Sequence, residues 1–278
     1  MLRREFHGRT FNRMSIGEPQ FLEVGCAEKQ RRIAYLTNPG PDPEGLGLVW
    51  LIGLKSDMVS TKATALAKWA PANGFGLTRF EYSGHGSSSG DFEEATIGDW
   101  LEETREVFCK VTKGRQIVIG SSTGGHLALL LLRDLMARDP EAADRIAALV
   151  LIAPAWDLTE ELMWKEMPPE AQREIMEQGV TYRPSEYDDP YPITRKFIEE
   201  GRNHLFKGEP FDPGRPVVIL QGQLDTAVPP SHARRLANFI EGGWAELIEV
   251  ADGEHRMSRP QDLELMFETI KRVGAMVA

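Results

Sequence analysis

Residues 116–132 have the sequence QIVIGSSTGGHLALLLL, and this stretch decides the fold. A β-branched run gives way to small residues and then to strong helix formers, which predicts a strand, a sharp turn and a helix. The turn matches the pattern GxSxG with Ser122 at its centre, because Ile119 excludes Ser121 from that position. We expect Gly120 and Gly124 to flank Ser122 because such a turn leaves no room for a Cβ on either side.

The pattern GxSxG alone is a weak signal, since glycine and serine are common. The alternative is a glycine-rich turn whose helix N-terminus binds a phosphate or nothing. No lysine follows the glycines, which argues against a phosphate-binding P-loop.

Buried strands and helices alternate on both sides of this turn. Strands are predicted at 46–53, 76–82, 147–152, 216–220 and 245–250, and helices at 61–70, 96–113, 231–240 and 262–273. This alternation predicts an α/β fold with a mostly parallel sheet and helices on both faces. Two earlier strands, at 21–24 and 31–36, are expected to form an antiparallel edge.

Residues 156–212 interrupt the alternation. They contain helical segments at 158–166, 169–177 and 193–200 and no convincing strand. We therefore expect a core domain of residues 1–155 and 213–278 with a helical cap inserted at 156–212. The cap's large apolar side chains are expected mainly to attach it to the core, and a few could line an acyl pocket.

Composition excludes several classes of function. The 278 residues carry a formal net charge of −10, which argues against nucleic acid or an anionic membrane as the main partner. Two cysteines, Cys26 and Cys109, give no disulfide framework or metal-ligand spacing. The N-terminus lacks an apolar signal core and no run could span a bilayer, so we expect a soluble, cytoplasmic protein.

Polar residues follow four of the predicted strands, where an open parallel sheet places its ligands. Ser122, Asp225 and His255 occur in the order nucleophile, acid and base. A serine hydroxyl needs an imidazole to take its proton, and the imidazole needs a carboxylate to fix its tautomer. Asp157 is the rival acid, one strand earlier in the chain.

An oxyanion formed by such a serine requires main-chain donors. We expect these to be the amides of Thr123, at the helix N-terminus, and Leu54, in the loop after the strand at 46–53. His85 and His126 are candidates for substrate contact, with turn or surface packing as the alternative.

The chain resembles the α/β-hydrolase superfamily from about residue 20 to its end. Within it, the chain is similar to the mitochondrial palmitoyl-protein thioesterase group, also called alpha/beta hydrolase domain-containing protein ten. The similar stretches are Thr61-Lys62-Ala63, RFEYSGHGSS at 79–88, GSSTGG at 120–125 and His255-Arg256-Met257. The resemblance implies a Ser-His-Asp enzyme for long-chain acyl thioesters and oxygen esters. The loop at 54–57 and His126 depart from that group, and both are expected to border the pocket.

These patterns together predict a serine hydrolase of carboxylic esters or acyl thioesters, with no cofactor and no metal. Its substrate would be a small-molecule ester or an acylated thiol or protein. A peptidase, a carbon-carbon hydrolase and a cofactor-free haloperoxidase are alternatives, because the fold does not select the reaction. A non-catalytic small-molecule binder is a further alternative.

Overall fold

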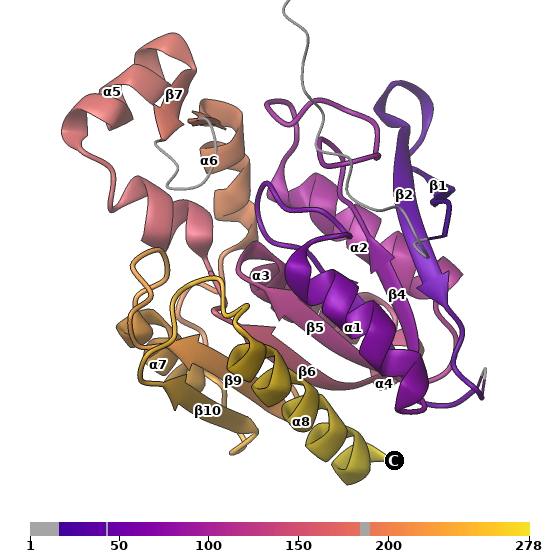
Figure 1. Cartoon of the computed structure of the whole chain (residues 1–278). Helices are drawn as coiled ribbons and strands as arrows, with labels where there is room; N and C mark the ends of the chain where they lie inside the picture. Colours follow the sequence, from indigo (N-terminus) through magenta and orange to yellow (C-terminus); the bar gives the residue numbers. More distant parts are fainter. Residues whose placement is uncertain (1–16, 43, 184–189) are drawn as a thin grey trace, which may run out of the picture.

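The computed structural model describes residues 17–42, 44–183 and 190–278. Its main sheet has eight strands (Figure 1). In spatial order they are β1 (Gln20–Val24), β2 (Arg31–Asn38), β4 (Gly76–Phe80), β3 (Gly47–Leu51), β5 (Gln116–Ser121), β6 (Ile146–Ile152), β9 (Val217–Gly222) and β10 (Ala245–Val250). β1 and β2 pair antiparallel at one edge, as predicted, and β2 is antiparallel to β4. From β4 to β10 every pairing is parallel.

The central strands are buried from end to end. Every residue of β3, β5 and β6 is buried, which explains why their sequences are almost continuously apolar. Because parallel strands end at the same edge, the loops after β3, β5, β9 and β10 meet there.

Helices cover both faces of the sheet (Figure 1), as the α/β prediction requires. They are α1 (Thr61–Ala72), α2 (Ile97–Val111), α3 (Thr123–Arg138), α4 (Pro140–Asp144), α7 (Pro230–Phe239) and α8 (Pro260–Val277). α1 packs on α8, where Trp69 stacks on Phe267 with 4.9 Å between ring centroids. On the other side α2 packs on α3. α1 continues through Pro71 instead of ending before it.

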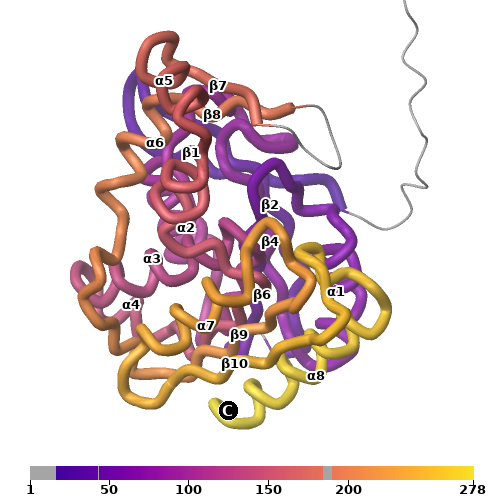
Figure 2. The backbone as a smooth tube through the Cα atoms, turned by 90° about the vertical axis from the view of Figure 1, so that its left-hand side faces the viewer, coloured from indigo at the N-terminus to yellow at the C-terminus, as the bar shows by residue number. Residues whose placement is uncertain are grey.

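The insertion between β6 and β9 lies at the end of the sheet where the loops after β3, β5, β9 and β10 meet (Figure 2). It contains a π-helix (Thr159–Trp164), α5 (Pro169–Gln178), β7 (Val180–Arg183), β8 (Tyr191–Thr194), α6 (Arg195–Gly201) and a 3-10 helix (Arg202–His204). The expectation that this region has no strand is wrong, because β7 and β8 pair as an antiparallel ribbon. Four-residue strands are too short to produce a clear alternating pattern. Residues 1–9, the N-terminal segment used for the localisation prediction, lie outside the described residues.

Candidate active site

Ser122 stands alone between a strand and a helix. It follows β5 directly and precedes the first residue of α3, with φ 54° and ψ −116°. Its main chain is fixed by the Ser122 amide donating to the Ile152 carbonyl at 2.9 Å and by the Ala155 amide donating to the Ser122 carbonyl at 3.0 Å. A non-glycine residue at positive φ is uncommon and points to a functional constraint.

The flanking glycines are required by close packing of the main chain. A Cβ on Gly120 would lie 2.2 Å from the Gly124 carbonyl oxygen, and a Cβ on Gly124 would lie 2.3 Å from the Leu51 carbonyl oxygen. Both distances are far below any contact that carbon and oxygen tolerate. The structure therefore supplies the steric reason expected for the GxSxG pattern.

Three loops that are 30 to 133 residues apart in the chain bring three polar side chains into a row. His255 Nε2 lies 3.2 Å from Ser122 Oγ, and His255 Nδ1 lies 2.8 Å from Asp225 Oδ2. Both distances allow hydrogen bonds. The imidazole thus stands between a hydroxyl and a carboxylate, with one ring nitrogen facing each.

The Asp225 carboxylate is held rigidly just after β9. Its side chain is fully buried. Oδ1 accepts the amides of Ala227 at 2.9 Å and Val228 at 2.8 Å, and Oδ2 accepts Gln221 Nε2 at 3.1 Å. These donors stabilise the ionised form of a buried carboxylate. Gln221 was not predicted at this site, because a glutamine inside an apolar strand gives no distinct sequence signal.

The rival acid, Asp157, serves another part of the molecule. Its oxygens accept the Phe206 amide at 3.1 and 3.3 Å, which ties the start of the insertion to its end. Burial raises the Asp157 pKa to about 6. The structure brings Asp225, and not Asp157, to His255.

The loop after β3 lies beside Ser122. A Cβ built on Gly53 would be 3.4 Å from Ser122 Cβ. Thr123 is the first residue of α3, where a helix amide has no partner within the helix. Across residues 17–42, 44–183 and 190–278, no hydrogen bond uses the amide of Leu54. These are the two main-chain donors expected from the sequence.

His85 and His126 are buried and bound to the main chain. His85 Nε2 accepts the Lys55 amide at 3.1 Å, and His126 Nδ1 accepts the Asp157 amide at 3.2 Å. Burial lowers the pKa of His85 to about 4 and that of His126 to about 3, so both rings are neutral at pH 7. This geometry favours internal packing over the expected substrate contact.

A lysine links α1 to the loop that carries His255. Lys62 Nζ donates to the Arg256 carbonyl and lies 3.3 Å from Ser258 Oγ. Desolvation, with the nearby Arg256 charge, lowers the Lys62 pKa to about 8. In the sequence alone, Lys62 stands out only as part of a family-like motif and has no predicted role.

Fold and site define a class of protein, and a family model agrees. The model of the alpha/beta hydrolase family matches residues 45–264. The chain belongs to the alpha/beta hydrolase family.

Individual relatives show which hydrolases the chain is similar to. The chain is 32% identical over 240 residues to the human mitochondrial palmitoyl-protein thioesterase ABHD10, covering 86% of this chain and 75% of that protein. The solved structure of mouse alpha/beta hydrolase domain-containing protein 10 matches with a TM-score of 0.80 and 31% identity, covering 94% of this chain and 100% of that one. A solved structure from Agrobacterium vitis S4 matches with a TM-score of 0.88 and 38% identity, covering 92% and 98%. These likenesses support a hydrolase of esterase type.

Metal sites and membrane spans can be judged over the described part of the chain. Within it, no three His, Cys, Asp or Glu side chains gather as they would around a metal ion. No helix in the same ranges is long and apolar enough to cross a membrane.

Proposed function

We propose that this protein is a serine hydrolase that cleaves carboxylic esters or acyl thioesters through an acyl-enzyme. The observation that carries the proposal is the row of contacts from Ser122 Oγ through His255 to Asp225, at 3.2 and 2.8 Å. Nucleophile, base and acid in hydrogen-bond reach of one another are what this chemistry needs.

In the first half of the proposed reaction, Ser122 Oγ attacks the carbonyl carbon while His255 Nε2 takes its proton. Asp225 holds the imidazole in the required tautomer and stabilises its protonated form. The amides of Leu54 and Thr123 bind the oxyanion, each contributing roughly 3 to 4 kcal/mol to the transition state.

The same groups complete the first half and then carry out the second half. The tetrahedral intermediate collapses, and His255 gives its proton to the departing alcohol or thiol. In the second half, water deprotonated by His255 attacks the acyl-Ser122 ester. The second tetrahedral intermediate collapses as His255 returns the proton to Ser122 Oγ, and the acid product leaves with Ser122 restored.

The apolar space next to Leu54 supports placing the acyl group beneath residues 156–212, which we propose act as a cap. A cavity of about 10 Å³ lies there, lined by Leu54, Phe92, Met163, Tyr191, Pro192, Ile193, Thr194 and Phe197. That volume holds about one water molecule. A long acyl chain would therefore need the cap side chains to move apart.

We take the proposed class of substrate from the names of the relatives. Palmitoyl-protein thioesterase is the printed activity of the human relative, and an acyl thioester fits the proposed chemistry. The word mitochondrial in that name describes the relative; a cytoplasmic location, the absence of a cofactor and the class of acyl substrate stay predictions for this chain.

Replacing the nucleophile tests the proposal. Ser122→Ala should lower kcat for a nitrophenyl ester by on the order of 10⁴-fold or more, with an unchanged thermal unfolding midpoint. Retained turnover would contradict the proposal. A panel of esters and thioesters of increasing acyl length then tests the cap, because a pocket that opens for fatty chains predicts an optimum at long chains.

A further inference from the structure

The loop after β3 contains a residue in an unfavourable backbone conformation. Lys55 has φ 57°, in the left-handed region that side chains with a Cβ adopt at a cost. Its amide donates to His85 Nε2 at 3.1 Å. The neighbouring residue Leu54 carries the amide proposed for the oxyanion hole, so the hydrogen bond from Lys55 fixes the main chain beside that donor.

The other ring nitrogen of His85 settles its hydrogen-bonding roles. Nδ1 lies 3.2 Å from the Ser83 carbonyl oxygen. A carbonyl can only accept, so Nδ1 carries the proton and Nε2 is the acceptor for the Lys55 amide. Burial lowers the His85 pKa to about 4, which keeps this neutral tautomer at working pH.

Aromatic side chains hold the His85 ring in place. The rings of Tyr82, Phe92 and Trp100 meet it edge to face, with centroids 5.7, 5.4 and 5.2 Å away. Such arrangements are favourable and specific in angle. The His85 ring is therefore a fixed support for the Lys55 amide.

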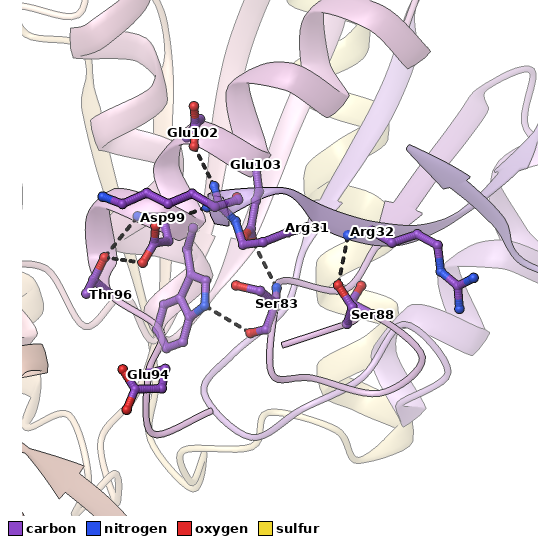
Figure 3. A network of polar contacts seen from close by, with 12 residues as sticks. Arg31, Arg32, Ser83, Ser88, Glu94, Thr96, Asp99, Glu102 and Glu103 are labelled. Carbon is purple, nitrogen blue, oxygen red and sulfur yellow. Dashed lines mark hydrogen bonds and ion pairs between the residues drawn. The ribbon is translucent and has the colours of Figure 1, made fainter. Parts of the chain in front are cut away.

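The carbonyl that orients His85 is itself anchored to the sheet. The Ser83 amide donates to Glu103 Oε2 at 2.9 Å, and Trp100 Nε1 donates to the Ser83 carbonyl at 3.1 Å. Arg31 of β2 donates to Glu103 Oε1 at 2.6 Å, so the support continues to β2 of the main sheet (Figure 3).

The far end of the same loop has its own clamp. The Met58 amide donates to Glu81 Oε1 at 3.1 Å, and Arg79 donates to the Met58 carbonyl at 2.9 Å. Arg79 and Glu81 project from the end of β4 and the residue beyond it. Met58 is therefore held independently. The turn at Leu54 and Lys55 is closed by the Ser56 amide donating to the Gly53 carbonyl at 3.1 Å, and the Lys55 amide attaches that turn to His85 in the loop after β4.

We propose that His85 is a positioning residue that fixes the oxyanion-hole loop through the Lys55 amide. The inference rests on the proposed function, because it assigns the Leu54 amide to the oxyanion. It differs from a substrate-binding role in a measurable way. A support for the oxyanion hole affects kcat, whereas a substrate contact affects KM.

Two substitutions separate the acceptor from the ring. His85→Phe keeps an aromatic ring and removes the acceptor; His85→Gln removes the ring and can place an oxygen near the position of Nε2. His232→Phe is the matched control, because His232 is also buried and contacts an aromatic side chain, Trp156. We expect its kcat to stay within about twofold of wild type.

The measurement is kcat and KM for a nitrophenyl ester, with the affinity for a trifluoromethyl ketone that forms a tetrahedral adduct. His85→Phe should lower kcat by about 10- to 100-fold, below or near the loss of one direct oxyanion donor. KM should change little, ketone affinity should fall in parallel with kcat/KM, and His85→Gln should recover about tenfold. Equal losses in the two variants, an unchanged kcat, or a rise in KM alone would overturn the inference.

A measurement on the unmodified protein covers the case in which the variants do not fold. ¹⁵N NMR should find His85 neutral with its proton on Nδ1 at pH 7; a proton on Nε2 would overturn the inference. Wild type that neither turns over esters nor reacts with a fluorophosphonate would sink the proposed function and this inference together. An active wild type with His85→Phe unaffected would sink this inference alone.

Discussion

The loops at the strand ends and the insertion at 156–212 are held in place by different means. At the strand ends, Ser122 occupies positive φ, and Gly120 and Gly124 pack against main-chain atoms at distances that exclude a Cβ. The insertion attaches through apolar side chains such as Phe197, with exposed ion pairs such as Lys196 to Glu94. Exposed pairs contribute little to stability. Main-chain geometry thus positions the candidate active-site residues, whereas side-chain contacts hold the insertion in place.

The largest expected difference between the two regions concerns their buried aspartates. Asp225→Asn should lower kcat by about 10⁴-fold, because an amide no longer selects the productive tautomer of His255. Asp157→Asn should leave kcat within about threefold, since Asp157 contacts the Phe206 amide and not His255. Steady-state hydrolysis of a nitrophenyl ester measures both. If Asp157→Asn lowered kcat more than Asp225→Asn does, Asp157 of the insertion would be the acid that orients His255.

Two glycine substitutions test the difference between the regions through the free energy of unfolding. Gly124→Ala should cost about 3 kcal/mol or more in the free energy of unfolding, because main-chain atoms must shift. Gly179, after α5 in the insertion, has φ +87° and no atom within 4 Å of the position that a Cβ would take. Gly179→Ala should cost only the torsional penalty of about 1 to 2 kcal/mol. Urea unfolding of both variants checks this, and equal costs would contradict the difference between the regions.

A further difference is a pH dependence of stability at the junction of the two regions. The His126 pKa is about 3 in the folded protein against 6.5 ordinarily. Between these values the unfolded chain binds a proton that the folded chain does not, so this contribution to stability is complete above pH 6.5 and is lost as pH falls. The loss is about 1.4 kcal/mol per pH unit.

His126→Asn tests that dependence, since an asparagine oxygen can accept the Asp157 amide without titrating. Its free energy of unfolding should fall less steeply than that of wild type between pH 6.5 and 4. Parallel curves from urea unfolding at several pH values would mean that His126 is not buried in its neutral form.

Much of the strand-end region could be predicted because short-range rules fix it. The β-branched run before Gly120, the small residues around Ser122 and the order of Asp225 and His255 follow from local geometry and chain order. The sheet, its antiparallel edge and its helices followed from the alternation of apolar segments. The family comparison and the structure agree with that fold.

The rest depends on contacts between distant residues. The hairpin of β7 and β8 is stabilised by pairing and by packing on the core, which its short sequences do not announce. His85 lies 30 residues from Lys55, whose amide it accepts. Gln221 has the sequence context of an ordinary strand residue, and only the structure shows that its side chain donates to Asp225. A side chain that acts on main-chain atoms leaves little trace in a sequence.

The most direct test of the central claim is to find which atom becomes acylated. Wild-type protein treated with a fluorophosphonate, digested and mapped by mass spectrometry should carry one adduct per chain, on Ser122, and His255→Ala should react far more slowly. An adduct on Ser121 or on another residue, or ester turnover that survives complete labelling of Ser122, would contradict the account.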